Sequence, residues 1–244
     1  MPGSEIRFYQ VAIDGLSVVT HKGGAGDECF ELLGGFTLDQ LRWIFSSYTE
    51  EELIATGWDA TSIANSDGDE TTHLWSELSA DCPETEIMIA GPDSESGTYE
   101  YFSETIFPDM DNGETFDDVR PDGYFSSASD EEIITYLDEN NDAIAYFGFA
   151  YYSDNQDKIS AAAIENADGE FVMPSSETVA DGSYNPLARR IYMNLWNDEA
   201  ALAVTVPFVQ FGLGPQGAVL VSQTGYVPIA SPDLDIAVSK TNSA

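Results

Sequence analysis

The sequence predicts an α/β fold, because segments with the pattern of buried strands alternate along the chain with segments of helical periodicity. An apolar strand pattern covers residues 10–20, and a helical apolar stripe follows over 38–45. No internal repeat is visible in the sequence. The chain has 244 residues, of which 43% are apolar, so it is long enough to bury a sizeable core.

Further strands are predicted where short apolar runs lie between polar or turn-forming residues. These runs are 86–90, 143–148, 158–165 and 191–196. The segment 174–186 carries turn-forming residues between two prolines and is predicted to be a turn.

Helix starts are predicted from capping boxes, in which a Ser or Thr side chain and a Glu or Gln three residues later satisfy each other's backbone N–H groups. Thr37 with Gln40 forms one such pattern, and Ser129 with Glu132 forms another, whose helix runs through Leu137 and ends near Asn140. Other helices are expected at 98–106, after 148, around 207–213 and at 215–222.

Two of the predicted elements carry special expectations. Pro207 is expected in the first turn of its helix, because proline has no N–H and disrupts a helix interior. The polar and acidic stretch 48–82, anchored by Trp58 and Trp75, is expected to be an irregular surface excursion with a short helix.

Net charge disfavours two classes of partner. The chain has 8 Lys plus Arg against 44 Asp plus Glu, which gives −36, and residues 43–119 contain no Lys or Arg. Nucleic acid and anionic membranes are poor partners, because both are bound by clustered cations. Such self-repulsion is relieved by salt, so the composition is typical of proteins from marine or high-salt surroundings, with an acidic secreted protein as the alternative.

Cysteines and histidines give limited information. Cys29 and Cys82 would form a disulfide in an oxidising compartment and stay free in a reducing one. His21 and His73 lack partner motifs and are expected to be packed or solvated. No apolar run approaches the length of a membrane span, and the start lacks the pattern of a secretion signal, so we expect a mature or truncated chain.

The segment 91–102 is the most informative part of the sequence. It follows the predicted strand 86–90, and Ser96, Gly97 and Thr98 stand where the next helix begins. Free N–H groups and the positive end of the helix dipole meet at such a point and favour an anion. The alternative is that Ser96 simply caps the helix. The acidic loop 109–118 lacks the spacing of a calcium-binding loop and is interpreted as solvated charge.

Several segments, taken in order, resemble PstS-type phosphate-binding proteins, the substrate-binding components of phosphate ABC transporters. The resemblance implies a periplasmic-binding-protein type II-like α/β fold with two lobes and mixed sheets. It implies that Ser96, Gly97 and Thr98 contact phosphate, and it implies no cofactor and no metal. The segments that carry it are 13–19, 36–45, 91–102, 143–152, 174–189 and 225–228.

The resemblance also implies a domain organisation. Residues 1–10 correspond to the hinge entry and a remnant of lobe one, 11–188 to lobe two, and 189–244 to the second crossover and the C-terminal part of lobe one. An N-terminal part of lobe one, with its own phosphate loop, has no counterpart, so lobe one is expected to be incomplete.

One departure from the family concerns a cation. Many members carry an Arg a few residues before Ser-Gly-Thr, where this chain has Pro92, Asp93 and Glu95. Arg120 is the candidate substitute, with a structural ion pair as the alternative. Arg189 and Arg190 are interpreted as partners in hinge ion pairs.

The leading functional hypothesis is a non-enzymatic protein, expected as a monomer in the periplasm or at the cell surface. It would bind inorganic phosphate or a similar oxyanion in an interlobe cleft and deliver it to a membrane ABC permease. One alternative is a truncated or diverged homologue that acts as a surface or interaction protein, with an exposed apolar face near residues 192–211. A minor alternative is a metal-dependent phosphatase.

Overall fold

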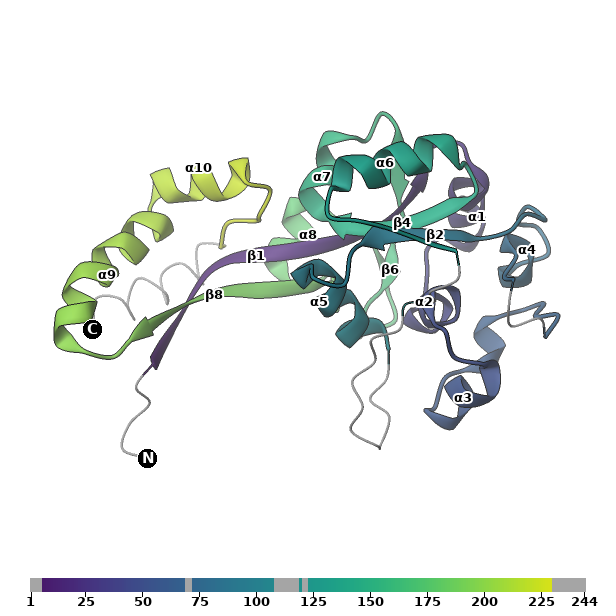
Figure 1. Ribbon diagram of the computed structural model, residues 1–244, viewed down its shortest axis with the longest axis horizontal. Coiled ribbons are helices and arrows are strands. Elements are labelled where there is room, and N and C mark those ends of the chain that lie inside the picture. Colours follow the sequence, from purple (N-terminus) through teal and green to yellow (C-terminus); the bar gives the residue numbers. More distant parts are fainter. Residues whose placement is uncertain (1–5, 69–71, 108–118, 120–122, 230–244) are drawn as a thin grey trace. The chain divides into compact units, whose positions relative to one another are not determined.

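A computed structural model describes residues 6–68, 72–107, 119 and 123–229 of the chain (Figure 1). Arg120 and the acidic loop 109–118 lie outside these residues. The elements in chain order are β1 (Ile6–His21), α1 (Ala25–Leu33), α2 (Leu38–Phe45), α3 (Glu50–Ala55), η1 (Ala60–Ser62), α4 (Trp75–Leu78), β2 (Met88–Pro92), α5 (Gly97–Ile106), β3 (Tyr124–Ser127), α6 (Asp130–Glu139), β4 (Ala143–Gly148), α7 (Phe149–Asp154), β5 (Ile159–Ala161), β6 (Ile164–Glu165), β7 (Phe171–Val172), α8 (Ser176–Asp181), β8 (Ala188–Trp196), α9 (Glu199–Leu213) and α10 (Pro215–Gln223).

The chain divides into two compact units. Unit 1 comprises the described residues of Met1–Gly15, Ser175–Tyr184 and Ala188–Ala244. Unit 2 comprises those of Leu16–Pro174 and Asn185–Leu187. The fold is of the α/β class, as the sequence predicts.

A mixed sheet forms the centre of unit 2, with strand order β3-β2-β4-β1-β5. β2 runs parallel to β3 and β4, while β1 is antiparallel to β4 and β5. Parallel strands need crossover connections, which α5 and α6 provide. Both faces of the sheet are covered by helices, which explains why β4 is buried nearly throughout and reads as a continuous apolar run.

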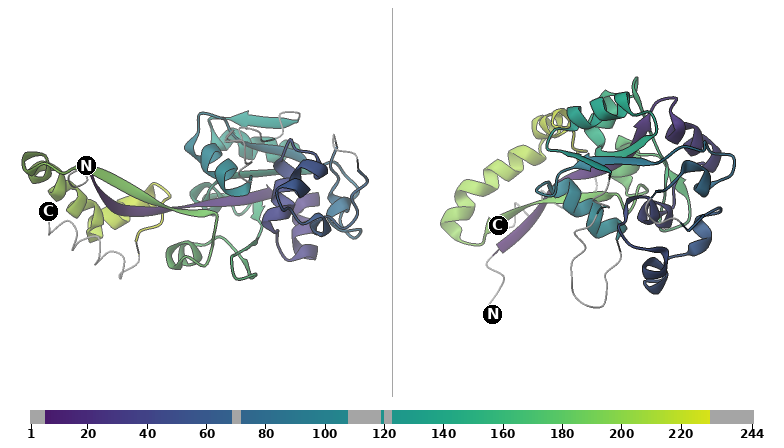
Figure 2. Two further views of the ribbon diagram at one scale, coloured as in Figure 1. Left: turned by 90° about the horizontal axis from the view of Figure 1, so that it is seen from below. Right: turned by 45° about the vertical axis from the view of Figure 1, so that its right-hand side comes forward.

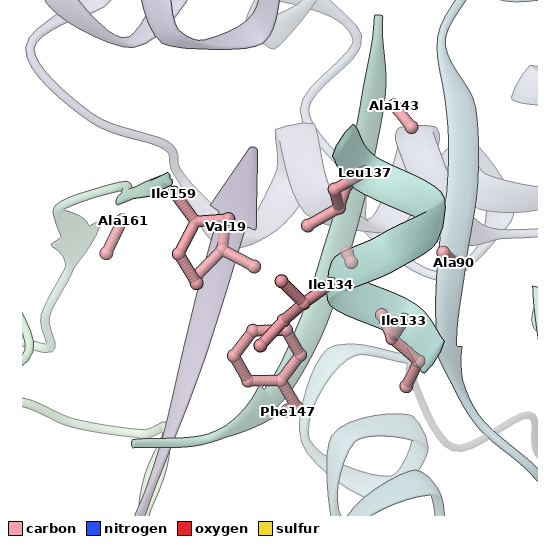
Figure 3. Close-up of a cluster of buried hydrophobic side chains, with 10 residues drawn as sticks. Val19, Ala90, Ile133, Ile134, Leu137, Ala143, Phe147, Ile159 and Ala161 are labelled. Atoms are coloured by element: carbon pink, nitrogen blue, oxygen red, sulfur yellow. The ribbon is translucent and has the colours of Figure 1, made fainter. Parts of the chain in front are cut away.

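One face of this sheet packs against α6. Ile133, Ile134 and Leu137 point from the helix toward the strands, where Val19 and Phe147 meet them (Figure 3). Their three- and four-residue spacing places them on one side of the helix. This layer fixes α6 over the sheet.

The other face of the sheet carries an aromatic layer under α5. Phe102 of α5 stacks on Tyr146 of β4 with ring centroids 3.7 Å apart, and Phe45 of α2 meets both rings edge to face. The layer needs a glycine in the neighbouring strand. A Cβ built on Gly91 would lie 2.5 Å from the hydroxyl oxygen of Tyr124 and 2.7 Å from the Tyr146 ring.

A disulfide links Cys29 of α1 to Cys82, which settles the open question of whether these cysteines pair. It ties α1 to the stretch 48–82. The described residues of that stretch contain three helical elements, α3, η1 and α4. The stretch is less superficial than the sequence suggests, because Trp75 is fully buried and donates from Nε1 to the Asp142 carbonyl at 2.9 Å. Trp58 is also buried, so both tryptophans are anchors as predicted.

Unit 1 contains a ribbon of β8 paired antiparallel with the first half of β1, from Ile6 opposite Trp196 to Gly15 opposite Ala188 (Figure 2). Tyr9 and Leu195 of the ribbon pack with Leu202 and Val209 of α9. Arg189 pairs with Asp14 at 3.2 Å, as expected for a stabilising ion pair near the crossover. Arg190 donates to the amide oxygen of Gln10 at 2.9 Å, and it forms no ion pair with another described residue.

Much of unit 1 is apolar and exposed. The sequence has no charged residue from 200 to 232, and large side chains of the ribbon and of α9 and α10 are at least 40% exposed. Among the described residues no single helix has the length and hydropathy of a membrane span; α9 and α10 meet that test only together, and they bend by 71°. The exposed side chains include Phe8, Tyr192, Trp196, Val204, Phe208, Phe211, Val219 and Leu220.

One predicted helix start and one predicted capping box are wrong, although α6 does begin after Ser129, which is its N-cap. Pro207 lies inside α9, because Asp198 caps the helix two turns earlier, its Oδ1 accepting from the N–H groups of Ala200 and Ala201. Ser129 makes no side-chain capping bond to α6. The Glu132 carboxylate instead accepts from the Ser127 hydroxyl at 2.6 Å.

Two predicted segments differ in extent. The turn predicted at 174–186 contains α8, which Ser175 and Thr178 open with a capping box. The strand predicted at 158–165 is divided into β5, which joins the main sheet, and β6, which pairs with β7. The capping box of Thr37 and Gln40 is confirmed.

We predict that the double variant Cys29→Ala, Cys82→Ala loses roughly 2–4 kcal/mol of unfolding free energy, because the bond closes a loop with a sequence separation of 53 residues. Urea unfolding measures this loss. Reduced wild-type protein is the matched control and should lose a similar amount. Equal midpoints for the oxidised and reduced wild type would contradict the prediction.

We predict that Gly91→Ala lowers the unfolding free energy by about 1–3 kcal/mol, because the added methyl must displace two tyrosine side chains. Gly148→Ala is the control: its backbone φ is −59° and its Cβ would meet no atom within 4 Å. The control should change stability by less than ~0.5 kcal/mol. Equal stability of the two variants would show that the space over Gly91 is not constrained.

Candidate functional site

The candidate site lies in unit 2, where the buried strand β2 ends at Pro92 and α5 begins at Gly97. Its position follows from the sheet, because β2 is flanked by the parallel strands β3 and β4. In α/β sheets, ligands bind beyond the carboxyl ends of parallel strands. Figure 1 shows α5 following directly from this end of β2.

Ser96, Gly97 and Thr98 come together at the first turn of α5. Ser96 is the N-cap, and its hydroxyl oxygen accepts from the Thr98 N–H at 3.2 Å. Gly97 is exposed, while Ser96 and Thr98 are half-buried. Ser96 therefore caps the helix through its hydroxyl oxygen. The hydroxyl proton is not used by this bond and can be donated to an anion, so the two interpretations of Ser96 are compatible.

The turn before the helix is ordered by Asp93. Its backbone carbonyl accepts from the Ser96 N–H at 3.0 Å, and its carboxylate oxygen Oδ1 accepts from the Glu95 N–H at 3.1 Å. Asp93 thus folds the turn by the short-range bonding typical of aspartate. The sequence alone does not reveal this role, because it shows Asp93 simply as an acidic residue near the position where many family members carry an Arg.

The strand end beneath the turn is held by two tyrosines. The Tyr124 hydroxyl donates to the Pro92 carbonyl at 2.6 Å and lies 3.1 Å from the Tyr146 hydroxyl. Burial raises the pKa of the Tyr124 hydroxyl above its usual range, and burial likewise raises the pKa of Tyr146. Both groups therefore stay protonated and neutral at physiological pH.

The charges around the turn are negative. Asp93, Glu95 and Glu100 lie in or beside it, and no Lys or Arg occurs in residues 43–119. Any anion bound here would be held by hydroxyls, N–H groups and the helix dipole. The sequence candidate for a cationic ligand, Arg120, lies outside the described residues and stays a prediction.

Arg42 serves the opposite end of α5. Its guanidinium donates to the Ile106 carbonyl in the last turn and pairs with Asp39 at 2.6 Å. A cation at a helix C-terminus stabilises the helix dipole, and the same helix presents its positive end at Gly97. A surface cavity of about 390 Å³ borders Arg42, but the guanidinium there is already bonded to these two partners.

Comparison with known proteins identifies relatives of the chain. No family model matches it. It is 30% identical over 181 residues to protein SphX of Synechococcus elongatus, covering 74% of this chain and 51% of that protein. It is 24% identical over 191 residues to the phosphate-binding protein PstS of Staphylococcus saprophyticus, covering 78% and 47%. The chain thus spans about half the length of these curated relatives.

The fold is similar to that of a solved structure described as "a possible phosphate binding protein" from Planctomyces limnophilus. The TM-score is 0.72 at 26% identity, and the match covers 98% of this chain and 72% of that one. The resemblance seen in the sequence is therefore confirmed: the chain is a relative of the PstS-type phosphate-binding proteins and has their periplasmic-binding-protein-like α/β fold.

Proposed function

We propose that this chain belongs to a substrate-binding protein that binds inorganic phosphate in an interlobe cleft and delivers it to a membrane ABC permease. The observation that carries the proposal is the turn Ser96-Gly97-Thr98, which stands at the exposed N-terminus of α5 in a relative of phosphate-binding proteins. Binding and release would suffice for this function, so no chemistry is assigned to the site.

Neutral donors can hold a phosphate in so acidic a protein. The energy of binding comes from oriented hydroxyl and N–H groups at short range, and the first turn of a helix supplies several such groups together. The field of the distant carboxylates is screened within about 8 Å at physiological ionic strength and over a shorter distance in higher salt. We therefore propose that phosphate binds best in saline surroundings, with Arg120 as a further ligand.

We retain the domain assignment as part of the proposal: 11–188 as lobe two, 1–10 as hinge entry, and 189–244 as the second crossover and C-terminal part of lobe one. The exposed apolar side chains of α9 and α10 support it, because helices with so many exposed apolar side chains normally pack against other polypeptide. On this assignment, further polypeptide of lobe one would cover them.

We further propose a location outside the cytoplasm, in the periplasm or at the cell surface, and a monomeric state. The disulfide between Cys29 and Cys82 supports the location, because such bonds persist in oxidising compartments. The strongly negative surface supports a partner other than nucleic acid.

The exposed apolar side chains of β8, α9 and α10 favour a second candidate function, that of a surface or interaction protein that has lost phosphate transport. Exposed Tyr192, Trp196 and Phe208 would then contact a partner protein. The two candidates differ in whether the turn at Ser96 binds phosphate. The phosphatase alternative is not proposed, because no three metal-ligating side chains converge within the described part of the chain.

We predict that calorimetry of the full-length protein in high-salt buffer, with phosphate, arsenate and sulfate compared as ligands, detects binding of phosphate. Thr98→Val removes one hydroxyl and keeps the side-chain shape, so it should weaken phosphate binding about tenfold, a typical loss for one charge-assisted hydrogen bond.

Thr105→Val is the matched control for this measurement. Thr105 lies in the same helix, and its hydroxyl donates to the Tyr101 carbonyl at 2.7 Å, away from the first turn. The control should bind phosphate like the wild type. A folded wild-type protein that gives no heat with phosphate would overturn the proposed transport function and favour the interaction protein.

A further inference from the structure

We propose that Tyr124 is a positioning residue of the phosphate turn, acting through its hydroxyl bond to the Pro92 carbonyl, with Tyr146 as its support. The proposal rests on the proposed function of Ser96, Gly97 and Thr98 and adds to it the residues that would hold their backbone in place.

Tyr124 holds the point where the strand becomes the turn. It lies on β3, beside β2, in register with Ile89, and its side chain reaches along β2 to the carbonyl of Pro92. Pro92 has no N–H, so the carbonyl is its one backbone group for hydrogen bonding. Pro92 is buried, and the bond of 2.6 Å satisfies that carbonyl within the protein.

Tyr146 supports Tyr124 from the middle of the sheet. Because the Tyr124 proton is donated to Pro92, the 3.1 Å contact between the hydroxyls is made with Tyr146 as donor and the Tyr124 oxygen as acceptor. Hydrogen bonds in such a series strengthen one another. The Tyr146 ring is fully buried and stacked on Phe102 of α5, so it is fixed by both the sheet and the helix.

Gly91 makes this arrangement possible. It lies between Pro92 and the rest of β2, and only its lack of a side chain lets the Tyr124 hydroxyl and the Tyr146 ring approach the strand. Gly91 on β2, Tyr124 on β3 and Tyr146 on β4 thus act together to form the hydrogen bond to the Pro92 carbonyl. Such a device fixes the direction in which the chain leaves the sheet toward Asp93 and Ser96.

The need for this device follows from the charges of the turn. A flexible cationic side chain can follow an anion, whereas backbone N–H groups and a capping hydroxyl attract it only when they converge in advance. With no Lys or Arg in residues 43–119, the part of the affinity that the turn itself supplies would depend on its fixed geometry, whether or not Arg120 adds a contact. Because burial raises the pKa of both tyrosines, both hydroxyls keep their protons at physiological pH, where phosphate is an anion.

The test is the variant Tyr124→Phe, which keeps the ring and removes the hydroxyl. We expect phosphate affinity, measured by calorimetry, to fall about five- to tenfold, the effect of losing one buried hydrogen bond. We also expect the backbone N–H groups of Ser96 and Thr98 to exchange hydrogen faster by a similar factor in the phosphate-free protein. These N–H groups are bonded within the turn, to the Asp93 carbonyl and the Ser96 hydroxyl, so their exchange reports its order.

Tyr136→Phe is the matched control. Tyr136 is a partly buried tyrosine of the same unit, its ring stacks on Phe125, and its hydroxyl contacts the Met88 sulfur at 3.9 Å rather than the Pro92 carbonyl. It should leave both the affinity and the exchange at Ser96 and Thr98 unchanged. A loss of affinity shared equally by the two variants would indicate a general loss of stability and overturn the proposal.

The two readouts separate this proposal from the proposed function. Unchanged exchange at Ser96 and Thr98 in Tyr124→Phe overturns the positioning role, whether or not phosphate binds. Faster exchange at these residues alone, in a protein that binds no phosphate, supports the positioning role and overturns the phosphate function.

Discussion

The stacking of Phe102 on Tyr146 is the interaction on which the candidate site depends, because it fixes α5 to the sheet. The N-terminus of the helix can present its N–H groups at a defined place only if the helix itself is immobile. Gly91 has no side chain, so the aromatic rings can pack against β2. Arg42 donates a hydrogen bond to the Ile106 carbonyl at the C-terminal end of α5. Packing, capping and the helix dipole thus act on the same ten-residue element.

Charge sets the second constraint. A net charge of −36 opposes both compaction and anion binding. The charge is not spread evenly along the chain, and the two units differ in the groups that they expose. In unit 2, the candidate site offers neutral groups, and buried hydrogen bonds hold the strand end beneath it. In unit 1, α9 after Glu199 and the whole of α10 contain no charged residue and expose apolar side chains, which suits contact with other polypeptide.

Local patterns predicted the elements whose structure is decided locally. The strand before Gly91, the helix after Ser96 and the capping box at Thr37 are confirmed, because each depends on residues within a few positions. The capping box predicted at Ser129 does not form, because the Glu132 carboxylate accepts from the Ser127 hydroxyl instead. The helix start predicted at Pro207 is wrong, because α9 is capped by Asp198, nine residues earlier in the sequence. The contact of Tyr124 with Pro92 joins residues 32 apart in sequence and depends on the pairing of β2 with β3, which periodicity does not reveal.

The central claim is that the first turn of α5 binds phosphate through its backbone and hydroxyl groups. The most direct measurement is an NMR titration that follows the backbone N–H resonances as phosphate is added. The account predicts saturable shifts that are largest at Gly97 and Thr98, with small shifts along the rest of α5. Phosphate-induced shifts that omit Gly97 and Thr98, or that are absent throughout the chain, would contradict it.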